Sequence, residues 1–65
     1  SMIVGTFHSD GSLVLQKGTR LITVKEGDYP VYEEVSYFAV RFPVVGTIRF
    51  PKHLVKGKTS FRINQ

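Results

Sequence analysis

Few side chains in this sequence have the chemistry that catalysis or metal binding requires. The chain has no cysteine and only two histidines, His8 and His53, so a thiolate site is excluded and a histidine site lacks ligands. Glu33 and Glu34 are adjacent, and neighbouring side chains on a strand point to opposite faces, so they cannot act together as general acid and base. The sequence therefore predicts a protein that is not an enzyme, with no catalytic residues, no cofactor and no metal.

Charge is unevenly distributed along the chain. The net charge is +4, but residues 1–40 carry three basic and five acidic side chains, a net −2, whereas residues 41–65 carry six basic and no acidic side chains, a net +6. Such an imbalance favours an anionic partner, which could be nucleic acid, an acidic peptide or an anionic membrane surface. A plain basic surface that keeps the domain soluble is the alternative. The residues predicted to contact nucleic acid are Arg41, Arg49, Lys52, Lys58 and Arg62.

Glycine and proline divide the chain into short segments in which apolar and polar residues alternate, a pattern typical of strands. The predicted strands span residues 2–8, 13–15, 20–25, 35–42, 45–50 and 59–64. Residues 28–34 contain Pro30 and much of the acidic charge, so they are predicted to form an exposed loop or a ragged hairpin. Residues 52–57 are predicted to form a turn, with one tight helical turn as the alternative.

Six short strands with one apolar face each cannot remain a flat sheet, because that face would stay in water and both edges would stay open. The sequence therefore predicts an all-β fold: a small, partly open or closed, five- to six-stranded antiparallel barrel. This single domain spans residues 1–65, with Ser1 as a remnant of expression. The predicted core consists of Val4, Leu13, Leu15, Leu21, Val24, Phe38, Val40, Phe42, Ile48, Phe50, Phe61 and Ile63.

The sequence also bears on where the protein works. No apolar run approaches the ~18 residues that a membrane-spanning helix needs, so no membrane span is predicted. Residues 2–5 are too short for the apolar centre of a signal peptide. The lack of cysteine and of a targeting signal favours the cytoplasm.

Two segments, residues 13–21 and residues 50–55, have a residue pattern that resembles the Src-homology-3 family. In residues 13–21 a leucine, an apolar residue, two polar residues and a glycine resemble the run that opens the second strand of that family. Residues 50–55, Phe-Pro-Lys-His-Leu-Val, resemble its aromatic-Pro-x-x-Tyr-Val segment, which forms a short helical turn. Tyr37 and Phe38 would correspond to the paired aromatic residues that start the third strand. The resemblance covers roughly residues 3 to 55 and implies a Src-homology-3-like barrel that binds a peptide.

The sequence differs from that family at the positions that bind a proline-rich ligand. Tyr37 stands at the tryptophan position, Leu54 stands at the tyrosine position, and the first loop keeps only Asp10 as an acid. These departures argue against a proline-rich ligand. Residues 58–65 also add a strand. The predicted walls of any remaining groove are Phe7, Tyr37, Pro51 and Leu54.

The leading functional prediction is a non-catalytic protein-interaction module that binds a peptide or protein partner. Tyr29 and Tyr32 lie in the predicted acidic loop, where they either form an apolar docking patch or pack onto the barrel end. The alternative is nucleic-acid binding, because Tyr37 among the arginines of the last strands offers a stacking ring beside phosphate-neutralising charge. Ordinary polar pairs on a solvated sheet face would give the same composition. The acidic loop and the basic half can also meet between copies, which would give a homo-oligomer.

Overall fold

The computed structural model describes residues 2–65, and Ser1, predicted to be a remnant of expression, lies outside the described residues. The described chain is all-β apart from one helical turn. Its strands are β1 (Met2–Ser9), β2 (Val14–Lys17), β3 (Arg20–Thr23), β4 (Gly27–Glu33), β5 (Tyr37–Phe42), β6 (Gly46–Pro51) and β7 (Phe61–Ile63). The turn, α1 (Lys52–Val55), confirms the helical alternative for this segment. None of residues 2–65 belongs to a helix long and apolar enough to cross a membrane.

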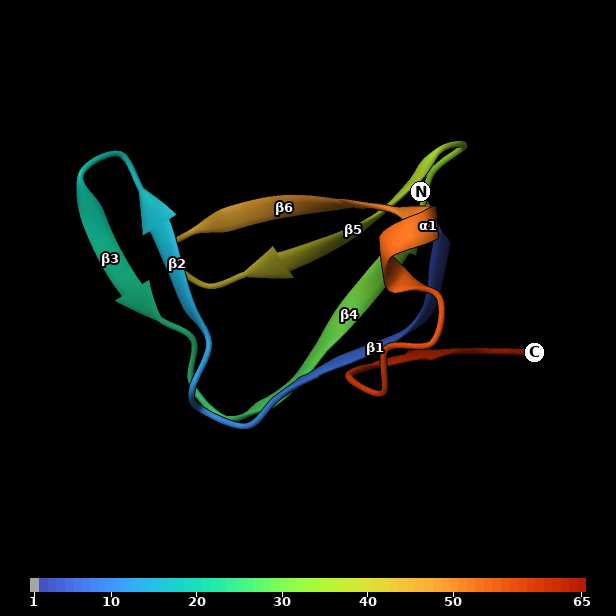
Figure 1. Cartoon of the computed structure of the whole chain (residues 1–65), viewed down its shortest axis with the longest axis horizontal. Coiled ribbons are helices and arrows are strands. Elements are labelled where there is room, and N and C mark those ends of the chain that lie inside the picture. Colours follow the sequence, from blue (N-terminus) through green and yellow to red (C-terminus); the bar gives the residue numbers. More distant parts are fainter. Residues whose placement is uncertain (1) are drawn as a thin grey trace.

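Five strands form one antiparallel sheet in the order β6-β5-β4-β1-β7, and β2 and β3 form a separate two-stranded sheet. The β2–β3 hairpin is inserted between β1 and β4 and projects at one end of the molecule (Figure 1). α1 connects β6 and β7, which are the two edge strands of the five-stranded sheet.

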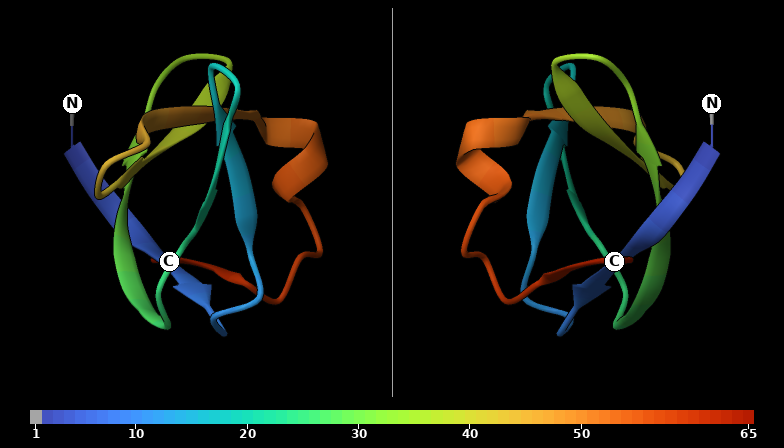
Figure 2. Two further views of the ribbon diagram at one scale, coloured as in Figure 1. Left: turned by 90° about the vertical axis from the view of Figure 1, so that its left-hand side faces the viewer. Right: turned by 90° about the vertical axis from the view of Figure 1, so that its right-hand side faces the viewer.

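Each strand of the five-stranded sheet contributes one aromatic ring to a continuous cluster. The Phe7 ring meets those of Phe42 and Phe61, with centroids 5.6 and 4.9 Å away. Tyr29 extends the cluster from Phe42 at 5.3 Å, and Phe50 extends it from Phe61 at 5.2 Å. Because Phe50 belongs to β6 and Phe61 to β7, rings from the two edge strands touch. The sheet is therefore strongly curved around this cluster (Figure 2).

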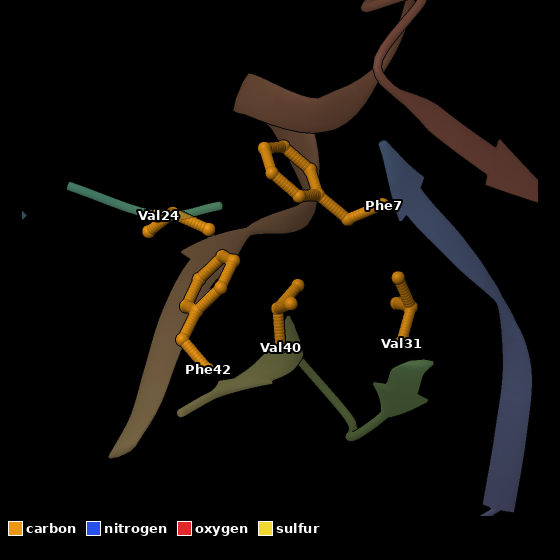
Figure 3. Packing of buried hydrophobic residues seen from close by; sticks show 5 residues of the cluster. All are labelled: Phe7, Val24, Val31, Val40 and Phe42. Carbon is orange, nitrogen blue, oxygen red and sulfur yellow. The ribbon is translucent and has the colours of Figure 1, made fainter. Parts of the chain in front are cut away.

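The centre of the core consists of Phe7, Val24, Val31, Val40 and Phe42 (Figure 3). Val31 and Val40 are fully buried and are directly paired across β4 and β5. Every predicted core residue except Leu21 belongs to this core or packs against it. The alternation of apolar residues in the sequence therefore located most of the inner face.

Leu21 is the exception, and its prediction as a core residue is wrong. It is 74% exposed. Leu15, which faces the core, pairs directly with Ile22 on β3, and directly paired residues point to the same face of a sheet. Ile22 therefore lies on the same face as Leu15 and Leu21 lies on the opposite, exposed face, one position from the predicted register.

The prediction of an exposed loop for residues 28–34 is also wrong. These residues form most of β4, which lies between β1 and β5 in the sheet. Pro30 has no N–H to donate, but the pairing of β4 with β5 begins only at the next residue, Val31. The strand can therefore accommodate a proline that would be excluded from a fully paired position.

Candidate binding surfaces

Strand pairing determines which side chains point away from the core. Val31, Val40 and Ile48 form one paired row across β4, β5 and β6, and they face the core. The neighbouring row must face outwards, because side chains alternate along each strand. The outward residues of these three strands include Tyr32, Tyr37, Ala39, Arg41, Thr47 and Arg49.

Two arginines on this outer face lie over two tyrosine rings. Arg41 Cζ is 5.4 Å from the centre of the Tyr32 ring, and Arg49 Cζ is 5.8 Å from the centre of the Tyr37 ring. Both distances permit a cation–π interaction. Each pair also bridges two strands, β4 to β5 and β5 to β6. We call these four residues the sheet-face cluster.

The sheet-face cluster lines a depression of about 420 Å³. Ala39 lines the depression too and is only 7% exposed although it points outwards, so the larger side chains of the cluster shield it from solvent. Since a longer side chain at Ala39 would fill the depression, its small size keeps the space open. Thr47 and Glu34 complete the lining.

The cluster combines residues from the two predicted interfaces. Tyr32 was predicted to contact a protein partner, and Arg41 and Arg49 were predicted to contact nucleic acid. Tyr37 belonged to both predictions, as a groove wall and as a stacking ring. Tyr32 and Arg41 lie on different strands, with the turn between β4 and β5 separating them along the chain. Only the pairing of β4 with β5 brings their side chains together. The sequence placed Tyr37 among these arginines but not Tyr32, because residues 28–34 were predicted to form a loop and not a strand.

The remaining residues predicted to contact nucleic acid lie apart from the cluster. Arg62 is exposed on β7 and pairs with Thr6 on β1. Lys52 Nζ lies 2.8 Å from Glu33 Oε2 and 5.2 Å from the centre of the Phe38 ring, so its charge is already engaged. Lys58 is exposed in the loop between α1 and β7.

Two of the residues predicted to contact a protein partner, Phe7 and Tyr29, pack in or against the core. Phe7 is only 8% exposed and lies at the centre of the core, so its ring has little surface left for a ligand. Tyr29 packs against Phe42, and its hydroxyl donates to the Lys25 carbonyl oxygen at 2.7 Å. Pro51 is exposed and pairs with Tyr37, and Leu54 is exposed on α1.

A second surface lies where the hairpin meets the turn between β5 and β6 (Figure 1). It is a cleft of about 270 Å³, which we call the hairpin cleft. Lys17 Nζ donates to the Val44 carbonyl oxygen at 2.7 Å and so ties the hairpin tip to this turn. The lining residues are Ile22, Thr23, Val24, Lys25, Tyr29, Pro43 and Val44.

Val44 has an unfavourable backbone conformation. Its φ angle is 68°, and among residues 2–65 it is the only non-glycine residue with a positive φ. A β-branched residue rarely adopts this conformation, because its side chain crowds the backbone there. Val44 is also 61% exposed. Folding therefore accepts backbone strain at Val44 without burying most of its apolar side chain.

The loop after β1 is held by local hydrogen bonds. The Ser12 N–H donates to Asp10 Oδ1 at 2.9 Å, and the Ser12 hydroxyl donates to the same oxygen. Hydrogen bonds from the Ser12 hydroxyl and N–H hold the pKa of Asp10 below its ordinary value of 3.8, the hydroxyl having the larger effect.

Replacing Ser12 with alanine is expected to raise the pKa of Asp10, because the hydroxyl bond to its carboxylate is lost. A lowered pKa in the folded state stabilises the fold above the unfolded pKa, and this stabilisation disappears as the pH falls through the folded pKa. NMR titration of the Asp10 carboxyl carbon measures the change. Ser12→Thr, which keeps the hydroxyl, is the control. An unchanged titration midpoint in Ser12→Ala would show that the hydroxyl is not the cause.

No family model, no curated protein and no solved structure matches the chain. Within residues 2–65, no three His, Asp or Glu side chains come together in a group that could hold a metal ion.

Proposed function

We propose that this chain is a non-catalytic protein-interaction module of Src-homology-3-like, small-barrel architecture, and that its hairpin cleft binds an acidic peptide segment with an apolar anchor. The strand order β6-β5-β4-β1-β7 supports the architecture. The first strand, β1, lies between the last strand, β7, and the central strand β4, so both ends of the chain belong to the same sheet. The ring contact between Phe50 and Phe61 brings the edge strands towards closure. α1 lies in the segment that resembles the short helical turn of that family.

The exposed, strained Val44 is the observation that carries the proposal. Residues held in unfavourable backbone conformations cluster at ligand sites, where the strain serves binding. A left-handed conformation costs a non-glycine residue roughly 1–2 kcal/mol. Val44 presents its apolar side chain at the rim of the hairpin cleft, where most of it is exposed to solvent. A partner that binds there would bury this apolar surface.

Charge around the hairpin cleft favours an acidic partner. Lys25 lines the cleft, Lys17 is bonded to its rim, and Arg20 pairs with Lys17 at the tip of the hairpin. Neither the hairpin segment 11–25 nor the segment 35–65 contains an acidic residue. Carboxylates of a partner would therefore find three cations beside an apolar cleft.

The size of the hairpin cleft favours one anchoring side chain over a whole small molecule. Small-molecule sites usually occupy roughly 300–1,000 Å³, and they bury most of the ligand. The cleft occupies about 270 Å³ and is apolar at Ile22, Pro43 and Val44. A leucine, isoleucine or phenylalanine of a peptide would fit this size and polarity, with flanking carboxylates on the cations.

Replacing Val44 with asparagine is expected to weaken peptide binding by about ten-fold, because burial of the valine side chain contributes on the order of 1.5 kcal/mol. Asparagine tolerates a positive φ, so the free energy of unfolding should stay equal or rise. An array of acidic peptides with a single apolar residue, followed by isothermal titration calorimetry of those that bind, provides the measurement.

Val35→Asn is the matched control, because Val35 is 96% exposed in the turn between β4 and β5, away from the cleft. It should leave the affinity unchanged. Equal weakening by both variants, or no binding to any acidic peptide, would disprove the proposal.

A further inference from the structure

The sheet-face cluster offers two aromatic rings on one solvent-facing surface. Tyr32 pairs with Ala39, and Tyr37 lies two residues before Ala39 on the same strand, so the two tyrosines are diagonal neighbours on one face. Diagonal neighbours on paired strands are roughly 7–8 Å apart, within reach of large side chains. Sheets that read single-stranded RNA present aromatic side chains in this way and stack two or three bases on them.

From this geometry we infer that the sheet-face cluster binds single-stranded nucleic acid, with Tyr32 and Tyr37 stacking on bases and Arg41 and Arg49 contacting phosphates. This activity is separate from peptide binding, because none of the four residues lines the hairpin cleft.

The arginines are positioned to change partners when nucleic acid binds. Without a ligand, each guanidinium lies over a tyrosine ring, at 5.4 Å for Arg41 and 5.8 Å for Arg49. A cation–π contact at an exposed site is weaker than the stacking of a base on the same ring. A base can therefore displace the guanidinium, which then becomes available to the phosphate beside that base.

The depression provides space for this exchange. Its volume is about 420 Å³, and the methyl side chain of Ala39 leaves room for a base between the tyrosines. Glu34 is the one acidic residue in the lining, so Arg41 and Arg49 leave a net charge of +1. Because this charge is small, stacking must contribute much of the affinity, and an unpaired base is required. Duplex nucleic acid hides its base faces and should bind less well.

Strand pairing extends the cationic surface beyond the depression. Arg62 pairs with Thr6, and Thr6 pairs in turn with Pro30. Pro30 lies two residues before Tyr32 on β4, so all of these residues are on the outer face of the sheet. Asp28 is also on this face, where its Oδ1 lies 2.8 Å from His8 Nδ1. A strand that stacks on Tyr32 and Tyr37 could therefore place a further phosphate near Arg62.

Fluorescence anisotropy with a labelled oligothymidylate of about ten nucleotides tests the inference, since single-strand sites of this kind cover about 4–16 nucleotides. We expect binding at about 50 mM salt that weakens as salt rises, with a slope of about −0.7 in log K against log salt for each phosphate neutralised. A duplex of equal length should bind more weakly. No binding at low salt, or equal binding of the duplex, would overturn the inference.

Variants of the tyrosines test stacking. Tyr37→Leu removes a ring without changing charge and should weaken binding by about ten-fold with an unchanged salt slope, because stacking on one ring is worth about that much. Tyr37→Phe keeps the ring and should keep the affinity. Circular dichroism establishes that each variant is folded. Unchanged affinity in both Tyr37→Leu and Tyr32→Leu would overturn the inference.

Variants of the arginines test the phosphate contacts. R41Q/R49Q should make the salt slope shallower by about 1.4, the sum for two phosphates. K17Q/K25Q removes the same charge from the hairpin end and should leave the slope unchanged. An equal effect of the two double variants would show non-specific attraction and would overturn the inference. Val44→Asn should not affect oligonucleotide binding, so the two proposed activities can fail independently.

Discussion

Replacing Phe42 with alanine is expected to remove most of the stability of this domain. Phe42 is 2% exposed, and its ring contacts those of Phe7 and Tyr29, with centroids 5.6 and 5.3 Å away. Removing such a ring costs about 3–5 kcal/mol, since the transfer free energy is lost and a cavity remains. A chain of 65 residues has a total stability of roughly 3–10 kcal/mol at 0.05–0.15 kcal/mol per residue. A large fraction of Phe42→Ala molecules should therefore be unfolded at room temperature.

Phe38→Ala is the matched control for this prediction. It removes the same atoms from the other end of β5, where Phe38 is only partly buried, packs against the core and lies beside Lys52. We expect a loss of about 1–2 kcal/mol, in proportion to the smaller apolar area buried. Urea denaturation followed by circular dichroism gives both free energies of unfolding. A loss in Phe38→Ala as large as that in Phe42→Ala would contradict the placement of Phe42 at the centre of the core.

The residues on β5 and β6 show what local sequence can predict. Phe38, Val40 and Phe42 alternate with polar or small residues, so a single strand contains enough contrast to identify its inner face. The same contrast placed Tyr37, Arg41 and Arg49 outwards. Three of the four residues of the sheet-face cluster were therefore predictable without knowing how the strands pair.

β4 shows why the fourth residue of the cluster, Tyr32, was not predictable. Tyr29 and Val31 point towards the core, but Tyr32 on the opposite face is also aromatic, so polarity does not alternate. Pro30 and the flanking acids add the signature of a loop. Only the pairing of β4 with β1 and β5 explains its position, and such pairing depends on residues distant in sequence.

Leu21 and Val44 show two further limits on what can be predicted from the sequence. Leu21 and Ile22 are adjacent apolar residues, so either could face inwards, and the choice depends on the pairing of Ile22 with Leu15. The positive φ of Val44 has no sequence signal, because this conformation normally selects glycine or asparagine. The hairpin cleft could not be predicted from sequence because it depends on both of these segments.

Replacing Gly5 with alanine is expected to detach β7 from the sheet. Gly5 pairs with Val31 on β4 and with Ile63 on β7, next to an irregularity in β1. A Cβ atom at Gly5 would overlap the carbonyl oxygen of Arg62 and lie 2.9 Å from Ile63 Cα. These are backbone atoms that cannot rotate away, so β7 must move, at a cost of about 1–3 kcal/mol for overpacking. Movement of β7 would also withdraw Phe61 from Phe7 and Phe50, which adds to the loss.

Hydrogen exchange of the β7 amides, together with thermal denaturation, distinguishes this local effect from general destabilisation. In Gly5→Ala the amides of β7 should lose protection first, because the collision acts on that strand. Gly18→Ala is the control: its φ is +62° and a Cβ there would meet no atom within 4 Å, so it introduces backbone strain without a collision. It should cost about 1 kcal/mol and leave β7 protected. If β7 keeps its protection in Gly5→Ala, the close approach of β1 and β7 at Gly5 does not hold this edge of the sheet.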